Sequence, residues 1–462
     1  MRLVSYIIPF VLTLLGSPLP QKPADLRIGI STNGRYFMQP DGAPFFWLGD
    51  TGWLLLTRLN REETVRYLDD RHRKGFNVIQ VMVLHSLDAV NVYGAQALVN
   101  GNVAEPKTTE GNSLSAPGQY DYWDHVDFVV DQAAARGICI ALVPVWGGNV
   151  KSGKVSEAQA EQYARFLANR YKSKPNIIWM NGGDIQGSDH QAVWNRIGAT
   201  LHAVDPHHLI TYHPRGRTSS SAWFHDQPWL NFNSVQSGHR RYEQDTSKGD
   251  WHYGQDNWKY IASDYKRTPA KPVIDAEPSY ENIPQGLHDT LQPRWTDSDV
   301  RRYGYWSVFA GAAGYTYGDN SVMQMLRPTD KGSAYGAKAY WYDAINDPGA
   351  AQMQYLKKLM LSRPYFERVP DQAIVAGNDG VKYDRLIATR GNKYAFIYTY
   401  NGRDMKIVMG KIAGASVKAS WYNPRNGETT PAGQYPNKGI IGFNPPGTPA
   451  DGNDWVLILD GQ

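Results

Sequence analysis

Residues 176–187 read NIIWMNGGDIQG. The first half of this stretch is apolar on both faces, which is typical of a strand in a buried parallel sheet. Two glycines then remove the side chains, and Asp184 follows directly. A buried strand that ends on an acid is typical of a barrel that delivers a carboxylate to its active face. Taken alone, Asp184 could instead cap a turn or the next helix.

Similar apolar runs recur between residues 45 and 320, separated by amphipathic stretches. The eight predicted strands are 45–49, 78–84, 138–145, 177–181, 209–213, 232–236, 273–276 and 315–317, and the helices between them are 61–74, 123–136, 157–171, 191–204, 257–265 and 299–309. Eight strands over roughly 280 residues match the count and size of a (β/α)8 TIM barrel. A doubly wound sheet is the alternative, but no G-x-G-x-x-G follows the first strand.

The pattern of predicted secondary structure changes after about residue 365. Six short strands are predicted at 385–389, 394–400, 406–409, 417–422, 439–443 and 455–459, with Asn-Gly and Pro-Gly turns between them. This pattern predicts a small all-β sandwich. We therefore expect a signal peptide at 1–20, a barrel domain at 25–368 and a β-sandwich domain at 369–462.

The N-terminus has the features of an export signal. Arg2 precedes an apolar run of signal-peptide length, and small residues follow that run. The single cysteine, Cys139, allows no intramolecular disulfide. These features predict an exported protein of a bacterial periplasm or exterior. Ser17 stands where a lipoprotein would need cysteine, so no membrane anchor is expected.

Composition narrows the class of partner. The formal net charge is +4 with no basic block, which gives nucleic-acid binding no electrostatic support. The chain contains 15 Trp and 29 Tyr, and aromatic faces with polar tips suit sugar rings. A carbohydrate substrate and a monomeric protein are expected. No H-E-x-x-H or Cys-x-x-Cys pattern occurs, so neither a metal nor a cofactor is predicted.

Polar residues follow each apolar run, at the end where a barrel has its active face. Asp184 and Glu277, after the fourth and seventh strands, are the leading carboxylates, because hydrolysis of a glycosidic bond needs two carboxyl groups across it. Glu277 could instead be a structural ion-pair partner. The predicted substrate-binding residues are Asp50, Trp53, His85, Trp146, Asn181, His213, Gln236, His239, Tyr280 and Asp319. Among these, Asp50 is a rival catalytic acid.

Five segments occur in order over about 270 residues: GDTGW, WMNGGD, QSGH, EPSYE and YWSVFAGAAGYTYG. Together they resemble the apiosidase-like domain family, glycoside hydrolase family 140. The tail from about residue 370 is similar to the small β domain that often follows it and carries a collagen-binding label. The resemblance implies a retaining glycosidase with Asp184 as acid/base and Glu277 as nucleophile. It also implies action on apiose-linked side chains of rhamnogalacturonan II.

Two features stand apart from this pattern. Asn282 replaces the small residue expected after EPSYE, which puts substrate identity in doubt. Gly183 and Asp184 stand where related barrels carry Asn-Glu, and we expect the two glycines to let backbone and sugar approach. The insert 91–119 is a candidate wall of the pocket. The alternative function is a non-catalytic carbohydrate-binding or adhesion protein, and for the tail a packing role is favoured over collagen binding.

Overall fold

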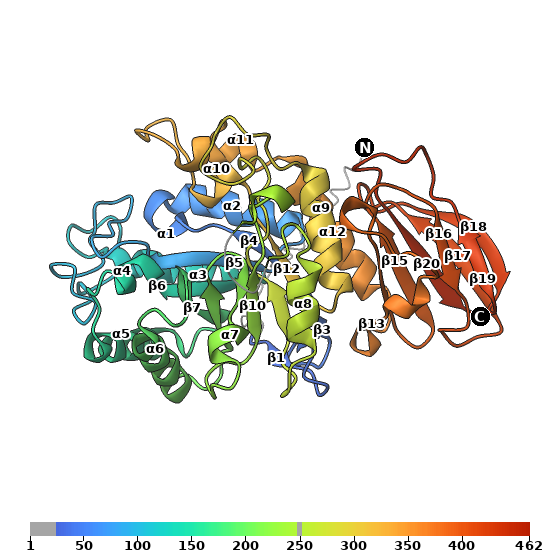
Figure 1. The fold of residues 1–462 in the computed structure, drawn as a ribbon. Helices are drawn as coiled ribbons and strands as arrows, with labels where there is room; N and C mark the ends of the chain where they lie inside the picture. The colour runs from blue at the N-terminus through green and yellow to red at the C-terminus, as the bar shows by residue number, and fades with distance from the viewer. Residues whose placement is uncertain (1–24, 247–251) are drawn as a thin grey trace, which may run out of the picture.

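The computed structural model of the chain describes residues 25–246 and 252–462. The predicted signal peptide therefore lies outside the described residues. Figure 1 shows two parts side by side. The N-terminal two-thirds of the chain form a sheet surrounded by helices, and the C-terminal residues form a β-rich part. Within the described part, no helix has the length and apolar character needed to cross a membrane.

The first part is a barrel of parallel strands, as predicted. Its neighbour order is β8-β7-β6-β5-β4-β12-β11-β10, and β9 adds an antiparallel strand beside β10. The bounds are β4 (Trp47–Thr51), β5 (Val78–Leu84), β6 (Cys139–Val145), β7 (Ile177–Ile185), β8 (Ile210–Pro214), β9 (Thr218–Ser219), β10 (Asn233–Gln236), β11 (Val273–Asp275) and β12 (Gly314–Tyr317).

Side chains join β8 to β10, which pair through no extended backbone ladder. The Thr211 hydroxyl donates to the Phe232 carbonyl at 2.7 Å, and the Ser234 hydroxyl donates to the Tyr212 carbonyl. The Asn231 N–H adds a bond to the Ile210 carbonyl at 2.9 Å. These bonds satisfy polar backbone groups between β8 and β10 that a continuous backbone ladder would otherwise satisfy.

Helices lie outside the barrel strands, as Figure 1 shows. The long helices are α2 (Arg61–Arg73), α3 (Tyr122–Ala134), α5 (Glu157–Tyr171), α6 (Gln191–Val204), α8 (Trp258–Tyr265), α9 (Asp297–Phe309) and α12 (Pro348–Leu361). Short helices are α1 (Leu55–Arg58), α4 (Gly147–Lys151), α7 (Ser221–Phe224), α10 (Asn320–Met323) and α11 (Trp341–Ala344). The Asp121 side chain accepts from the N–H groups of Trp123 and Asp124, so it caps α3.

A small antiparallel sheet covers the N-terminal ends of the barrel strands. It comprises β1 (Gly29–Ile30), β2 (Phe37–Met38) and β3 (Pro44–Phe45). The Phe37 ring packs against Trp47, the first residue of β4, and against Phe232, which precedes β10, with centroids 6.0 and 5.1 Å apart. Aromatic packing closes this end, so the opposite end of the barrel is the one that can hold a site.

The second part is an all-β sandwich, as predicted. A six-stranded antiparallel sheet has the order β13-β14-β15-β20-β17-β18, and β16 pairs with β19. The bounds are β13 (Val369–Pro370), β14 (Leu386–Arg390), β15 (Tyr394–Thr399), β16 (Met405–Val408), β17 (Ser416–Tyr422), β18 (Thr429–Pro436), β19 (Ile440–Phe443) and β20 (Trp455–Gly461).

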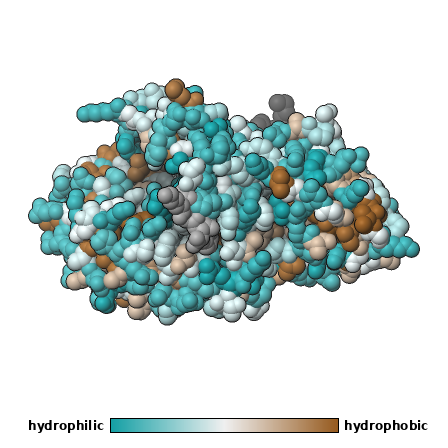
Figure 2. Space-filling model, in the orientation of Figure 1, coloured by the Kyte–Doolittle hydropathy of each residue, from teal (hydrophilic) through white to brown (hydrophobic). Residues whose placement is uncertain are grey.

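Strand β18 was not predicted. Its sequence, TTPAGQYP, contains two prolines and a glycine and has no apolar alternation, because it is an exposed edge strand that buries little on either face. Ile440 of neighbouring β19 is 63% exposed. Figure 2 shows hydrophobic residues grouped over this end of an otherwise mostly hydrophilic face.

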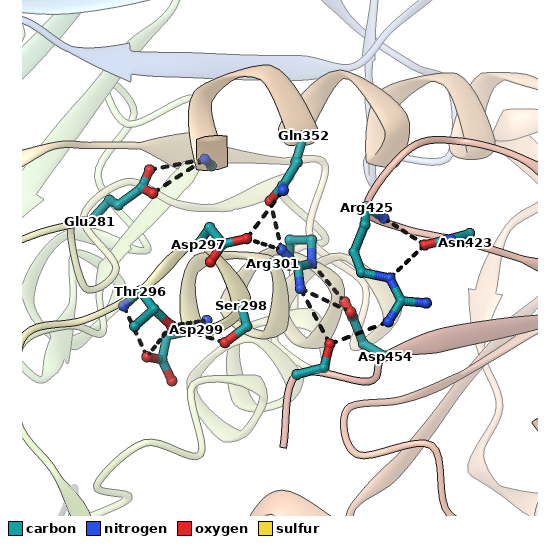
Figure 3. A network of polar contacts seen from close by, with 12 residues as sticks. Glu281, Thr296, Asp297, Ser298, Asp299, Arg301, Gln352, Asn423, Arg425 and Asp454 are labelled. Atoms are coloured by element: carbon teal, nitrogen blue, oxygen red, sulfur yellow. Dashed lines mark hydrogen bonds and ion pairs between the residues drawn. The ribbon is translucent and has the colours of Figure 1, made fainter. Parts of the chain in front are cut away.

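Helix α9 joins the two parts. Arg301 of α9 forms a two-point ion pair with Asp454, just before β20, at 2.9 and 3.0 Å (Figure 3). One turn further along the helix, the rings of Tyr305 and Tyr398 stack at 4.8 Å. Residues 299–309 are all buried, since the barrel lies on one side of α9 and the β sandwich on the other. The sandwich therefore supports a barrel helix.

Candidate active site

A cavity of about 360 Å³ opens at the C-terminal ends of the barrel strands. This volume is in the range of a small-ligand pocket. Its lining includes both predicted catalytic carboxylates together with predicted binding residues that follow β4, β6, β10 and β11. These lining residues are Asp184, Glu277, Trp53, Trp146, Gln236, His239 and Tyr280.

An irregularity in β7 directs Asp184 into the cavity. The register between β7 and β8 shifts between Gly182 and Ile185. Gly182, Gly183 and Asp184 have φ values of 89°, 123° and 52°, so the backbone leaves the extended conformation for three residues in succession. A bulge of this kind changes the direction of a side chain next to an active site. Asp184 remains solvent-accessible at the cavity wall.

The two glycines make room for neighbouring residues of the barrel. A Cβ atom on Gly183 would lie 2.5 Å from the Trp146 ring, and one on Gly182 would lie 2.6 Å from the His213 carbonyl oxygen. We expected the glycines to admit backbone and sugar. The structure instead shows that Trp146 and β8 occupy that space, and that positive φ values add a second requirement for glycine.

The surroundings of Asp184 favour its protonated form. Although the Asp184 side chain is exposed to the cavity, the surrounding protein shields its carboxyl from bulk water and so raises its pKa, and the negative charge of Glu277 raises it further. His213 and His239 and a hydrogen bond with Gln236 act in the opposite direction, but the net shift of the pKa is upward. A carboxyl group with a raised pKa beside a second carboxylate is suited to act as a general acid.

Glu277 is held in the opposite state. Burial by itself would raise the pKa of this carboxyl, but contacts with His213 and His239 lower it to about 2. The Nε2 atoms of the two imidazoles lie 3.0 Å from Oε2 and Oε1 respectively. Each oxygen therefore faces one imidazole, which fixes the carboxylate plane. An ionised carboxylate held in this way is suited to act as a nucleophile.

His213 connects the two carboxyl residues. The Asp184 backbone N–H donates to His213 Nδ1 at 3.4 Å. The other ring nitrogen, Nε2, lies 3.0 Å from Oε2 of Glu277. The bulge that directs Asp184 into the cavity therefore also contacts the imidazole that lies against Glu277.

Aromatic residues form one wall of the cavity. The Trp53 indole N–H donates to the Tyr280 hydroxyl at 3.2 Å. The Trp53 ring lies 5.5 Å from Trp146 and 5.3 Å, edge-on, from His213. Burial, followed by the charge of Glu277, raises the pKa of Tyr280 well above its usual value. Tyr280 is therefore a protonated phenol beside Glu277.

Asp50 and Asn181 do not reach the cavity, which corrects their predicted roles. Asp50 is fully buried, and its Oδ2 accepts from the Tyr67 hydroxyl and Arg71 Nε, each at 2.5 Å. The Asn181 amide donates to the Trp194 carbonyl at 2.8 Å, toward helix α6. Both side chains follow the pleat to the outer face of the sheet, where they join strand to helix.

Three further predicted binding residues also lie off the cavity lining. Asp319 caps α10 by accepting from the N–H groups of Ser321 and Val322. His85 contacts the Ser86 hydroxyl at 3.2 Å. His213 lies behind Glu277 and contacts that carboxylate. Asp319 and His213 are therefore assigned structural or positioning roles, and the binding role of His85 stays a prediction.

The cavity also contains residues that the sequence reasoning missed. Arg215, Arg217 and Arg240 line it, as do Gln324 and Tyr335. The three arginines come shortly after His213 and His239, in the stretches HPRGR and GHRR. The strand-end argument would have predicted them if it had included the residues that come after these histidines. The insert 91–119 contributes nothing to the lining, which corrects its predicted role. Segments 283–287 and 323–335 form that wall instead.

Comparison with known proteins agrees with this geometry. The family model described as "Apiosidase-like, catalytic domain" matches residues 31–367, and that of a "Putative collagen-binding domain of a collagenase" matches residues 369–460. No curated protein matches the chain.

Two solved structures are similar along nearly the whole chain. One, described as a glycoside hydrolase, is 47% identical over 94% of this chain and 97% of its own, with a TM-score of 0.89. Another, a glycoside hydrolase family 5 protein from Bacteroides vulgatus ATCC 8482, is 46% identical over 94% of both chains, with a TM-score of 0.89. A third structure from that organism shares the fold at 14% identity and a TM-score of 0.65.

Proposed function

This chain belongs to the apiosidase-like glycoside hydrolases, and we propose that it is a retaining enzyme that removes apiose-linked units from the pectic polysaccharide rhamnogalacturonan II. One observation carries the proposal. Two carboxyl groups line one cavity, and their surroundings move their pKa values apart, that of Asp184 upward and that of Glu277 down to about 2. Such a pair supplies an acid and a nucleophile at the same pH.

The first chemical step uses both groups. The Glu277 carboxylate attacks the anomeric carbon, and the bond to the glycosidic oxygen breaks as Asp184 gives that oxygen its proton. The products are a glycosyl ester on Glu277 and the free alcohol of the leaving sugar. His213 and His239 hold the Glu277 carboxylate in position for the attack.

The second step reverses the roles. Asp184, now a carboxylate, takes a proton from water as the water oxygen attacks the anomeric carbon and the ester bond to Glu277 breaks. Two displacements at the same carbon restore its original configuration. Proton NMR of the first product formed should therefore show the anomer of the substrate, and the opposite anomer would contradict the retaining mechanism.

An acidic polysaccharide fits the charge of the cavity wall. Arg215, Arg217 and Arg240 all line the cavity. Arg217 Nε pairs with Asp245 at 3.0 Å, whereas no acidic side chain in residues 25–246 and 252–462 forms an ion pair with Arg215 or Arg240. Guanidinium groups bind carboxylates in a two-point geometry, and the pectic backbone carries a carboxylate on each galacturonate.

Digestion of rhamnogalacturonan II tests substrate and charge together. We expect apiose-linked units to be released from the native polymer, and carboxyl-reduced polymer to be cut about 10-fold less efficiently, since one charge-assisted contact has about that effect. Arg240→Ala should reduce kcat/KM on the native polymer and leave the rate on the reduced polymer unchanged. Equal rates on both polymers would remove the acidic-substrate argument, and no release from a full pectic panel would overturn the substrate assignment.

The paired pKa shifts set a pH dependence. Activity needs Glu277 ionised and Asp184 protonated, so kcat/KM should be highest between a pKa of about 2 and the raised pKa of Asp184. Above that value the rate falls as Asp184 loses its proton, by about tenfold per pH unit. With Asp184→Ala and a substrate that needs no acid, the alkaline fall should disappear. If it persists, another group is the acid.

We also propose that the protein is exported to a bacterial periplasm or exterior, as its N-terminal sequence indicates. Cell fractionation of the full-length chain tests this proposal of export.

For the β sandwich we propose a supporting role. The contacts of Arg301 with Asp454 and of Tyr305 with Tyr398 favour this role over collagen binding.

A further inference from the structure

The segment that follows helix α10 brings a tyrosine to the cavity that neither the strand-end pattern nor the family resemblance indicates. Tyr335 lines the same cavity as Asp184 and Glu277 and is half-buried. We propose that Tyr335 contacts the substrate, and that its phenol hydroxyl binds a hydroxyl of the sugar held between the two carboxyl groups. The turnover part of this inference rests on the proposed function, whereas its binding part does not.

The backbone around Tyr335 is fixed from three sides. Asn320 Nδ2 donates to the Tyr335 carbonyl at 3.0 Å, and Arg294 Nη2 donates to the Gly336 carbonyl at 2.6 Å. The Gln324 amide makes two bonds to Ala334, donating to its carbonyl at 3.1 Å and accepting from its N–H at 2.7 Å. Amide and guanidinium side chains therefore hold this turn in one conformation.

The conformation that they hold is unfavourable for tyrosine. Tyr335 has φ 51° and ψ 30°, in the left-handed region that a bulky side chain rarely adopts. Such strain persists only where surrounding contacts overdetermine it, and it concentrates at functional sites. Here the hydrogen bonds on either side supply those contacts, and the strained residue lines the cavity.

The polar side chains of Gln324 and Tyr335 differ in whether their polar atoms have hydrogen-bond partners in the protein. Gln324 also lines the cavity, but its amide nitrogen donates to the Asn320 and Ala334 carbonyls and its amide oxygen accepts from the Ala334 N–H. The Tyr335 hydroxyl, in contrast, forms no hydrogen bond within the described residues. A hydroxyl held in position without a protein partner, in a cavity lined by catalytic groups, is available to a ligand.

The charge state of the hydroxyl supports a donor role. Burial raises the pKa of Tyr335, and the charges of Glu277 and Asp184, which line the same cavity, raise it further. The phenol therefore stays protonated at any pH at which the enzyme works. It can donate to a sugar hydroxyl or accept from one.

A purely structural role is the competing explanation. The Tyr335 ring lies 5.8 Å from the ring of His288, so it could serve only to pack this turn. Phenylalanine would keep that packing and remove only the hydroxyl. Tyr335→Phe should therefore leave the melting temperature unchanged under both explanations, but reduce substrate binding only if the hydroxyl touches the sugar.

The test uses oligosaccharides from rhamnogalacturonan II and two backgrounds. On the active enzyme, Tyr335→Phe should lower kcat/KM about 10-fold, the effect of one lost hydrogen bond. Tyr340→Phe is the matched control, because Tyr340 is 40% exposed and does not line the cavity. An unchanged kcat/KM in Tyr335→Phe would overturn the proposal, as would an equal loss in both variants.

Binding separates this inference from the proposed function. In a Glu277→Gln background, calorimetry measures the affinity for the same oligosaccharides without turnover. We expect Tyr335→Phe to weaken that affinity several-fold, by about the same hydrogen bond. If the active enzyme cuts nothing in the panel but the affinity falls, the proposed function fails and the Tyr335 contact stands. If turnover occurs and neither the affinity nor kcat/KM changes, the contact fails alone.

Discussion

Replacement of Glu277 by glutamine should lower kcat on a cleavable glycoside by on the order of 10⁴-fold or more, because no covalent intermediate can then form. The amide occupies the same volume, so the fold should be retained. It cannot, however, offer two anionic oxygens to the imidazoles of His213 and His239. Steady-state turnover and the thermal melting curve, measured on the same preparation, check this expectation.

The chain offers a matched control four residues further on. Glu281 is also buried, but its carboxyl accepts from the Tyr317 hydroxyl at 2.6 Å and from the Gly349 N–H at 3.0 Å, away from the cavity lining. Burial raises its pKa to about 7. Glu281→Gln should therefore leave turnover within a few-fold of wild type. Wild-type turnover in Glu277→Gln, or equal losses in both variants, would sink the nucleophile assignment.

Replacement of Asp184 by alanine should have an effect that depends on the leaving group. On an unactivated oligosaccharide the rate should fall by about 10²- to 10⁴-fold, the usual contribution of a general acid. On a dinitrophenyl glycoside the first step should proceed at close to the wild-type rate, because that leaving group needs no proton. Added azide should then restore turnover by attacking the glycosyl ester, and mass spectrometry should detect the glycosyl azide.

Asp189 supplies the control for this experiment. It lies on the loop after β7, and its carboxyl contacts Lys151 at 3.6 Å without lining the cavity. Asp189→Ala should cleave both substrate classes at close to wild-type rates. Equal losses of Asp184→Ala on activated and unactivated substrates, with no effect of azide, would argue against the acid role.

The sequence predicted the placement of the two carboxyl groups well. Apolar runs of strand length fixed where each barrel strand would end, and Asp184 and Glu277 follow from that position alone. The same pattern failed for Asp50, Asn181 and Asp319. A strand-end position states that a residue is near the rim, but the pleat and the neighbouring helix decide whether its side chain points into the cavity or away from it.

The glycines of the opening stretch show the same limit. Gly182 and Gly183 indicated an unusual backbone conformation, and their positive φ values confirm it. Which atoms need the space could not be read from NIIWMNGGDIQG, because the Trp146 ring and the His213 carbonyl come from other strands. Strand β18 was missed for a related reason, since an exposed edge strand carries no hydrophobic pattern.

By itself, then, the sequence determined the order of the strands and helices, the all-β tail and the two acids at the barrel mouth. These depend on local periodicity and on residues close together in the chain. Only the tertiary structure decided the chemistry of those acids. Their pKa values depend on charges and hydrogen bonds through space, and the imidazoles of His213 and His239 reach Glu277 from β8 and from the segment after β10. The arginines and Tyr335 enter the cavity in the same way, through contacts that form only when the barrel closes.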